Sequence, residues 1–329
     1  MPSMKGYHAL KNLPEEKVTD KISRRVLVGD QEMVVWWSMK AGAHAAAHQH
    51  PHEQIFWMIS GKMEFRLGTD IIVAAFHHPV RLAEDVAMLD VMSQGRITLG
   101  IAIGYKPDEF ALYGVDLEKR GARFEEQLTI IKGLWTQDRV SFKGAYYTVE
   151  GRLEPKPVTR LHPPVWIGGW GDITLKRAAT LADNWIPGPT ADLKRLLAGK
   201  KRFLDNRRAA GRSQPVAEWP LTRDLIIADT DRKARELAEE HIMIAYRKEY
   251  AGGWRHPFID SSVATDLDRL MADRFIIGGP EQCVAQIRRF TEEYGMTHLI
   301  CRTFFPGMAH THIMRELQLI AAEVAPAFR

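Results

Sequence analysis

The sequence has few of the features that mark secreted or membrane proteins. Only 2 cysteines, Cys283 and Cys301, occur in 329 residues, which predicts neither a disulfide framework nor a thiolate zinc site. No run of apolar residues reaches the length of about 18 that a membrane helix needs. Residues 1–20 are polar and lack the apolar centre of a signal peptide. We therefore expect a cytoplasmic protein with no membrane partner.

The sequence also lacks an excess of charge of one sign. The 45 Lys and Arg residues are interspersed with 41 Asp and Glu residues, for a net charge of +4, and no block of like charges stands out. This balance gives no indication of nucleic-acid binding. A hydrophobic fraction of 45% is that of an ordinary globular protein.

Two patterns meet near residue 67, and they predict two different kinds of structure. Before it, apolar residues alternate with a period of two, and glycines separate the runs, which is typical of short antiparallel strands. After it, strand-like runs alternate with amphipathic helices, which predicts βα units and a parallel sheet. We therefore divide the chain into residues 1–66 and 67–329. The strands expected in the first part cover residues 24–28, 33–39, 54–59 and 63–67.

The second part predicts an α/β barrel that is short of strands. Six strands are expected, and a (β/α)8 barrel of the TIM type has eight. Since the first pattern occupies the front of the chain, the first two βα units are the ones expected to be missing. The expected strands begin near Asp70, Ile97, Val165, Asn184, Leu221 and His298, a hairpin covers residues 140–152, a helix begins at Pro79, and further helices cover residues 123–135, 174–181, 192–210, 232–250, 281–294 and 313–325.

Nine segments of the second part, taken together, resemble the luciferase-like flavin-dependent monooxygenases in order and spacing. The resemblance implies a (β/α)8 barrel that binds reduced FMN and uses O2 to oxidise a small organic substrate, with a flavin reductase as partner. The segments are Leu67-Gly-Thr-Asp70, His78-Pro-Val-Arg-Leu-Ala-Glu-Asp85, Leu89-Asp90, Ser93-Gln-Gly-Arg96, Leu99-Gly100, Arg120-Gly-Ala-Arg-Phe-Glu-Glu126, Pro164-Val-Trp-Ile-Gly-Gly169, Arg274-Phe-Ile-Ile-Gly-Gly-Pro-Glu-Gln-Cys283 and Phe305-Pro-Gly-Met308.

A glycine-rich turn is the first candidate for cofactor binding. The turn Gly168-Gly-Trp-Gly171 leads from an expected strand into an expected helix, and Thr174 lies in the first turn of that helix. Backbone amides at a helix N-terminus form a cradle for phosphate, and a hydroxyl adds a donor. The resemblance implies that Gly169, Trp170, Gly171 and Thr174 hold the FMN phosphate. Alternatively, the glycines only allow the strand and the helix to pack closely.

Arg120 is the second candidate for the phosphate, since the resemblance implies an arginine just before the helix that begins near Arg123. The alternative for Arg120 is a solvated arginine at a helix start. The resemblance also implies that Gly104 and Tyr105, after the second expected strand, contact the flavin. Some relatives carry an arginine two residues before this tyrosine, where this chain has Ile103.

Further candidates lie around the first expected strand of the barrel. In relatives the end of this strand bulges beneath the flavin ring through a non-proline cis peptide, and the matching bond here is Asp70–Ile71. Asp70 is therefore a candidate cofactor contact, with an ordinary trans strand as the alternative. His77 and His78 follow the strand end, where the substrate would enter. We select His78 as the candidate catalytic residue, although a histidine before a proline is as often structural.

The first part of the chain resembles the first motif of the cupins. The matching residues are Gly42, His48, His50, Gln54 and Gly61. Two imidazoles that are two residues apart on a strand point to the same face, which suits a divalent metal. The second cupin motif is absent, so three ligands on a half-open wall would leave an ion solvated. We therefore predict no metal site.

The leading functional hypothesis is an FMN-dependent monooxygenase or oxidoreductase, expected as a homo-oligomer. A deazaflavin-dependent enzyme of the same fold, which transfers hydride without O2, is the first alternative. A cupin-like module that binds metal or a small ligand is the second, and an inactive chimera is the third.

Overall fold

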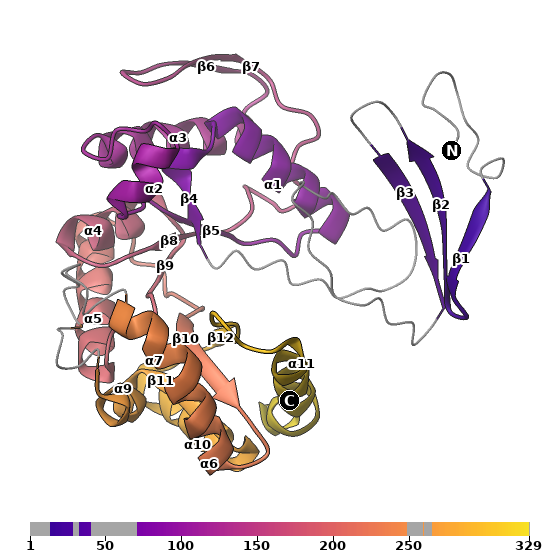
Figure 1. The fold of residues 1–329 in the computed structure, drawn as a ribbon. Coiled ribbons are helices and arrows are strands. Elements are labelled where there is room, and N and C mark those ends of the chain that lie inside the picture. Colours follow the sequence, from indigo (N-terminus) through magenta and orange to yellow (C-terminus); the bar gives the residue numbers. More distant parts are fainter. Residues whose placement is uncertain (1–13, 29–32, 41–70, 249–258, 260–264, 329) are drawn as a thin grey trace. The chain divides into compact units, whose positions relative to one another are not determined.

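The fold is that of a computed structural model, which describes residues 14–28, 33–40, 71–248, 259 and 265–328 (Figure 1). The chain divides into two compact units, Met1–Ser60 and Gly61–Arg329. Each unit is described by itself. No helix among the described residues is long and apolar enough to cross a membrane.

The first unit contains a three-stranded antiparallel sheet. Its strands are β1 (Glu15–Thr19), β2 (Ile22–Val28) and β3 (Met33–Met39), in the order β1-β2-β3. Strands β2 and β3 confirm the predictions for residues 24–28 and 33–39. Strand β1 was not predicted because its charged sequence does not alternate. It is aligned by ion pairs between directly opposed residues, Arg24–Glu16 at 2.8 Å and Arg25–Glu15 at 2.5 Å.

Several predictions for the first unit cannot be compared with the structure. The expected strands at residues 54–59 and 63–67, and the cupin-like residues His48, His50 and Gln54, lie outside the described residues. The metal question therefore stays a prediction.

The second unit contains seven parallel strands in two sheets. Sheet β4-β5-β8-β9 consists of β4 (Ile72–Val73), β5 (Leu99–Ala102), β8 (Val165–Gly168) and β9 (Asn184–Ile186). Sheet β11-β10-β12 consists of β10 (Pro220–Ile227), β11 (Phe275–Gly278) and β12 (His298–Arg302). Every pairing within them is parallel. The sheets meet where the amide of Thr222 donates to the carbonyl of Pro187 at 3.4 Å.

The six predicted strands are confirmed, but two details differ. Strand β11 was not predicted, because its three apolar residues, Phe275–Ile277, lie between Arg274 and a Gly-Gly-Pro turn and were considered only as part of a motif. Strand β12 lies in a second sheet with β10 and β11, so the parallel strands form two sheets where one was expected. No ladder joins β4 to β12 within the described part of the chain, so those residues show seven strands and no closed ring.

The predicted helices and the hairpin of β6 (Val140–Lys143) and β7 (Thr148–Gly151) are confirmed, except that the helix expected at residues 232–250 is described only to residue 248 and consists of two short helices. Helices α2 and α9 were not predicted, and a π-helical turn at Ala238–Ile242 joins α6 to α7. The helices are α1 (Pro79–Ser93), α2 (Pro107–Leu112), α3 (Arg120–Thr136), α4 (Asp172–Leu181), α5 (Leu193–Ala209), α6 (Asp231–Leu237), α7 (Met243–Tyr246), α9 (Leu267–Asp273), α10 (Pro280–Tyr294) and α11 (His310–Leu319).

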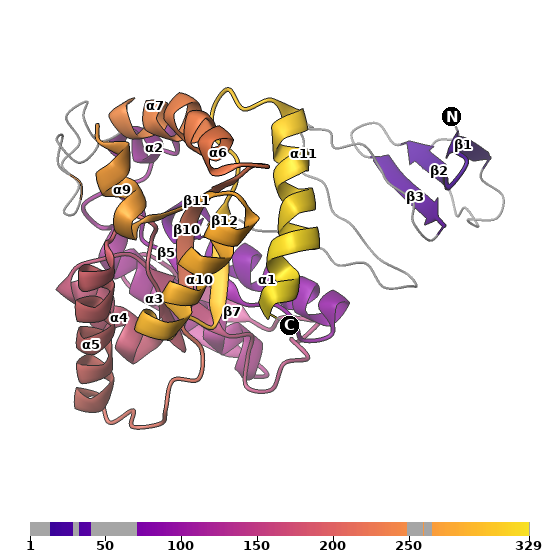
Figure 2. The same ribbon diagram turned by 90° about the horizontal axis from the view of Figure 1, so that it is seen from below.

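The hydrophobic core follows the two sheets, with helices packed around them (Figure 2). Helices α1, α3 and α4 bury their apolar sides against sheet β4-β5-β8-β9. Strand β10 has helices on both faces, since Leu225 packs in a cluster with α10 while Ile226 packs in a cluster with α6 and α7. Because the strands are parallel, the carboxyl ends of neighbouring strands meet at one edge, which is where sites form in such folds.

Candidate functional site

A cavity of about 420 Å3 opens beyond the carboxyl ends of β5 and β8. Two stretches of chain build it. The first runs from the end of β5 to the start of α3, and the second from the end of β8 into α4. The lining residues are Ile103, Glu118, Arg120 and Gly121 from the first stretch, and Trp170, Gly171, Asp172, Ile173, Thr174 and Arg177 from the second.

The N-terminus of α4 presents backbone donors to this cavity. Gly171 is the N-cap residue, and no side chain caps the helix. The first intrahelical bond runs from the amide of Leu175 to the carbonyl of Gly171 at 3.0 Å. The amides of Asp172, Ile173 and Thr174 therefore have no acceptor within the helix. A helix end of this kind attracts an anion.

The glycines before α4 are required at their positions for different physical reasons. A Cβ at Gly168 would overlap the side chain of Ile71, so this glycine allows close packing. Gly171 has a φ of 91°, and a Cβ there would meet nothing within 4 Å. Gly171 is therefore needed for the backbone conformation that presents the amides, not for close packing. The packing and phosphate interpretations thus apply to different residues of the same turn.

Two arginines add positive charge to the cavity. Arg120 begins α3, and its Nη1 donates to the carbonyl of Leu117 at 2.5 Å. Its Nε is buried and has no hydrogen-bond partner among the described residues. Arg177 comes from α4 and its Nε donates to Glu125 at 2.7 Å. The guanidinium of Arg177 lies so close to α3 that a Cβ at Gly121 would be 2.7 Å from its Nη2.

The acidic groups of the cavity are Glu118 and Asp172. Asp172 is paired with Arg202 of α5. Glu118 is exposed and forms no ion pair with any described residue. The cavity therefore combines backbone donors and two guanidiniums with one carboxylate, that of Glu118, which has no ion pair among the described residues.

Four of the nine predicted site residues line this cavity: Arg120, Trp170, Gly171 and Thr174. Gly169 lies beside them, since a Cβ there would be 3.1 Å from Cγ2 of Thr174.

Gly104 and Tyr105 follow Ile103 but do not line the cavity. Gly104 has a φ of 77° and packs so closely that a Cβ would be 2.6 Å from Val73. Tyr105 is exposed.

The remaining predicted residues are elsewhere. Nδ1 of His78 accepts the amide of Val80 at 3.4 Å and so caps α1, and its ring packs edge-on against Tyr147. This contact accounts for a histidine before the helix-opening proline. The carbonyl of His77 accepts a hydrogen bond from Nε2 of Gln127 at 2.9 Å. Asp70, and with it the Asp70–Ile71 bond, lies outside the described residues.

Arg177 was missed because Lys176-Arg177 has the appearance of a solvated helix face. Its position depends on a contact between α3 and α4 that a single sequence does not encode locally. The glycine directly after Arg120, Gly121, is the one signal in the sequence that could have indicated that another side chain approaches α3 closely.

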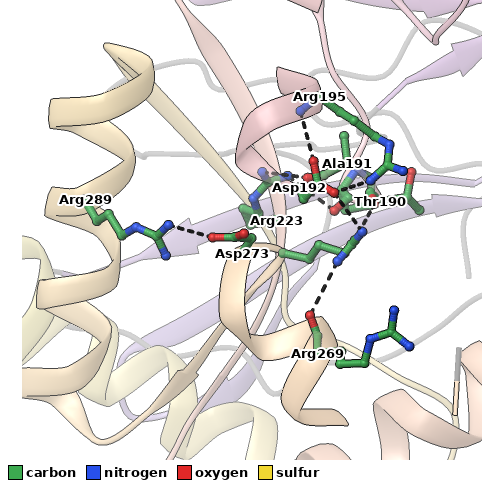
Figure 3. A network of polar contacts seen from close by, with 10 residues as sticks. Thr190, Ala191, Asp192, Arg195, Arg223, Arg269, Asp273 and Arg289 are labelled. Atoms are coloured by element: carbon green, nitrogen blue, oxygen red, sulfur yellow. Dashed lines mark hydrogen bonds and ion pairs between the residues drawn. The ribbon is translucent and has the colours of Figure 1, made fainter. Parts of the chain in front are cut away.

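Two buried arginines hold the loop that directly follows β9 (Figure 3). Nη2 of Arg223 donates to the carbonyl of Ala191 at 3.1 Å. Arg274 donates to the carbonyl of Thr190 at 2.9 Å and to Asp192 at 3.2 Å. Both guanidiniums are used to satisfy backbone carbonyls, so we assign them to the scaffold.

A second polar cluster lies at the end of β12. Asp224 of β10 is fully buried and accepts hydrogen bonds from Arg302 at 2.5 and 2.8 Å and from the hydroxyl of Tyr246 at 2.6 Å. Arg302 is the last residue of β12, directly opposite Asp224, and 41% of its side chain is exposed. A buried carboxylate thus orients a half-exposed guanidinium at the carboxyl end of a strand. These residues were not predicted from the sequence.

The parallel sheets and the helices that pack on them define an α/β protein, and the cavity beyond the ends of β5 and β8 is its candidate ligand site. Residues 63–298 match the family profile of the luciferase-like monooxygenases. The chain belongs to this family, and its fold is of the TIM-barrel type.

The curated relatives cover different reactions. An uncharacterized protein of Mycobacterium tuberculosis is 29% identical over 178 residues, which are 53% of this chain and 60% of that protein. The chain thus spans less than two thirds of the length of the first relatives it matches. The F420-dependent glucose-6-phosphate dehydrogenase of Amycolatopsis mediterranei is 27% identical, over 80% of this chain and 79% of the relative. The limonene 1,2-monooxygenase of Rhodococcus erythropolis is 26% identical, over 80% and 69%.

Solved structures share the fold. The monooxygenase RslO1 from Streptomyces bottropensis has a TM-score of 0.65 and 23% identity, covering 78% of this chain and 76% of that one. The oxygenating constituent of 3,6-diketocamphane monooxygenase from Pseudomonas putida, in complex with FMN, has a TM-score of 0.62 and 20% identity, covering 77% of both chains.

Proposed function

We propose that the chain is a flavin-dependent oxidoreductase that holds its cofactor by the phosphate in the cavity at the N-terminus of α4. The observation that carries the proposal is the convergence of Arg120, Arg177 and the amides of residues 172–174 on one cavity. A phosphate needs several donors and compensation of its charge, and these groups supply both. The buried Nε of Arg120 gives a further reason to expect an oxygen acceptor there.

The leading form of this proposal is an FMN-dependent monooxygenase. Reduced FMN, supplied by a flavin reductase, would provide the chemistry that transfers oxygen from O2 to a small organic substrate. The chain's own residues bind the phosphate, fix the position of the cofactor and cover it. Ile103, Trp170 and Ile173 provide the apolar part of the cavity wall. The limonene 1,2-monooxygenase among the relatives supports this form.

The alternative form uses a deazaflavin and transfers hydride without O2. The F420-dependent dehydrogenase among the relatives supports it. Titration of the purified protein with each cofactor, followed by fluorescence, tests the proposal, and binding of neither cofactor would refute it.

Replacing Gly171 with valine should weaken FMN binding by about 1–3 kcal/mol, which is roughly 5- to 150-fold in Kd. A β-branched residue does not adopt a φ of 91° without strain, so the backbone must rotate and redirect the amides of α4. The measurement is fluorescence quenching of FMN.

Gly211→Val is the matched control for this substitution. Gly211 also has a positive φ, 72°, with nothing within 4 Å of a Cβ, but it follows α5 and does not line the cavity. The control should share the loss of stability and keep the wild-type affinity. If both variants bind FMN with equal affinity, the turn at Gly171 has only a structural role.

We further propose that residues 1–66 are a cupin-like segment that takes the place of the first two βα units of the barrel. The antiparallel sheet β1-β2-β3 supports this, because a βα unit contains no antiparallel pair. Such a chain should bind FMN more weakly than a complete relative and should form a homo-oligomer to cover exposed sheet edges. Grafting the front end of a complete family member onto residue 67 tests this, and unchanged FMN affinity and coupling to product would contradict it. Metal bound after purification, without FMN binding, would favour the cupin-like module instead.

A further inference from the structure

The ion pair between Asp224 and Arg302 joins the interior of the second unit to its surface. The side chain of Asp224 is fully buried, whereas 41% of the side chain of Arg302 is exposed. No other ion pair between described residues combines a fully buried acid with an exposed base. In the pair of Asp229 and Arg315, for example, both partners are exposed. The Asp224–Arg302 pair is therefore neither a surface pair nor a pair of the core.

Asp224 holds the guanidinium of Arg302 in a defined orientation. Nε of Arg302 donates to Oδ1 of Asp224 at 2.5 Å and Nη2 donates to Oδ2 at 2.8 Å, so the pair is bidentate. The carboxylate is itself fixed, because the hydroxyl of Tyr246 donates to Oδ2 at 2.6 Å. An asparagine would accept the same bond from Tyr246 without burying a charge, and a buried charge costs free energy. The charge of Asp224 is therefore explained by the arginine that it orients.

The exposed end of Arg302 is suited to a second carboxylate. A guanidinium carries five N–H donors in a planar fork, and the pair with Asp224 uses two of them, on the edge formed by Nε and Nη2. Because that edge faces a buried carboxylate, the exposed part of the side chain is the other end of the fork, formed by Nη1 and Nη2. This end has the geometry that binds a carboxylate in the same bidentate way.

Arg302 also lies at the edge of the sheet where a substrate is expected. It is the last residue of β12, and proteins of the TIM-barrel type hold their substrates at the carboxyl ends of the strands. Two residues further, Phe304 is a large exposed apolar side chain. An oriented guanidinium followed by an exposed aromatic suits an organic acid, whose charged head and apolar body need different partners. Arg302 and Phe304 do not line the cavity at α4.

We propose that Arg302 binds the carboxylate of a small organic acid and, resting on the proposed function, that such an acid is the substrate of the flavin-dependent reaction. The guanidinium supplies the charge and two parallel N–H donors, and Asp224 supplies the orientation. This geometry selects a carboxylate over an uncharged amide or ester of the same shape.

The test is a pair of NMR titrations, in which the full chain is added to benzoate or to benzamide and the signals of the small molecule are followed. The two probes share the ring and the size, and only benzoate carries a charge. We expect benzoate to bind at least about 10-fold more tightly than benzamide. Arg302→Lys keeps a cation beside Asp224 but removes the second edge of the fork. It should weaken benzoate by about 10-fold or more and leave benzamide unchanged.

Arg315→Lys is the matched control, because Arg315 is an exposed arginine that also pairs with an aspartate. It should leave the affinity for benzoate unchanged. Equal losses for the two lysine variants, or a wild-type affinity in Arg302→Lys, would show that Arg302 only neutralises Asp224. Phe304→Ala changes an exposed position and keeps the test open if Arg302→Lys does not fold. It should weaken benzoate by about 3-fold or more and leave acetate unchanged, and equal affinities of this variant and the wild type for benzoate would overturn the site.

Titration of the same samples with FMN separates this inference from the proposed function. Bound benzoate should leave the Kd of FMN unchanged, because Arg302 does not line the cavity at α4. Displacement of FMN by benzoate would overturn the inference while the proposed function stands, since the acid would then occupy the phosphate site. Binding of neither FMN nor F420 would refute the proposed function and with it the role of the acid as substrate, while the benzoate titrations still decide whether Arg302 binds a carboxylate.

Discussion

Replacing Glu316 with glutamine is expected to raise the free energy of unfolding, by an amount that grows with pH. Glu316 lies on α11 with only 1% of its surface exposed. Burial raises the pKa of its carboxyl from 4.5 to about 8, and the backbone amide of Ile227 opposes this shift only partly. The folded protein therefore holds the proton more tightly than the unfolded chain does.

The direction of the pH dependence follows from this difference. Below pH 4.5 the carboxyl is protonated in both states and costs nothing. As the pH rises from 4.5 to about 8, the unfolded chain releases the proton and gains stability relative to the folded protein. The wild-type protein should lose about 3–5 kcal/mol over this window through this group, and glutamine should remove that loss.

Urea unfolding of the wild type and Glu316→Gln at pH 5 and pH 8.5 measures the effect. Glu323→Gln is the control, since Glu323 is an exposed carboxylate in the same C-terminal region. It should leave the pH dependence unchanged. A difference between Glu316→Gln and the wild type that is equal at both pH values would show that the Glu316 carboxyl titrates normally.

Replacing Asp224 with alanine should destabilise the second unit by about 3–5 kcal/mol. The substitution removes a fully buried carboxylate that accepts two bonds from Arg302 and one from Tyr246. The buried hydroxyl of Tyr246, a residue that is only 2% exposed, also loses its hydrogen bond to Asp224. The midpoint of urea unfolding reports the loss.

A second Asp–Arg pair near the same strand provides the comparison. Asp229, after β10, binds Arg315, but 63% and 50% of the two side chains are exposed. Asp229→Ala should therefore change the free energy of unfolding by less than about 1 kcal/mol. Similar losses for the two variants would mean that Asp224 contributes no more than a surface ion pair.

Local patterns predicted the elements of the second unit better than its tertiary contacts. The alternation of apolar runs with amphipathic helices sufficed for six strands, because burial on both faces leaves a strong signal in the residues themselves. Strand β11 and helices α2 and α9 were missed, since each has at most seven residues and depends on neighbours for its stability.

The parts of the candidate site that could be predicted are those in which a local sequence pattern itself indicates a chemical role. The glycine turn and Arg120 could be selected from the sequence, and the structure brings them together at one cavity. Arg177, Asp224 and Arg302 could not, because each becomes significant only through a partner far away in the chain. His78 illustrates the opposite case, since its position before Pro79 suggested chemistry while the structure gives it a capping contact.

All the described residues that line the cavity come from residues 103–177, a single stretch that includes α3, β8 and the first turns of α4. The proposed phosphate site is thus encoded by one continuous piece of sequence. An exchange of the chain before residue 103 would leave every one of these lining residues in place. If the proposed function is correct, such an exchange should alter the choice of substrate more readily than the binding of the cofactor.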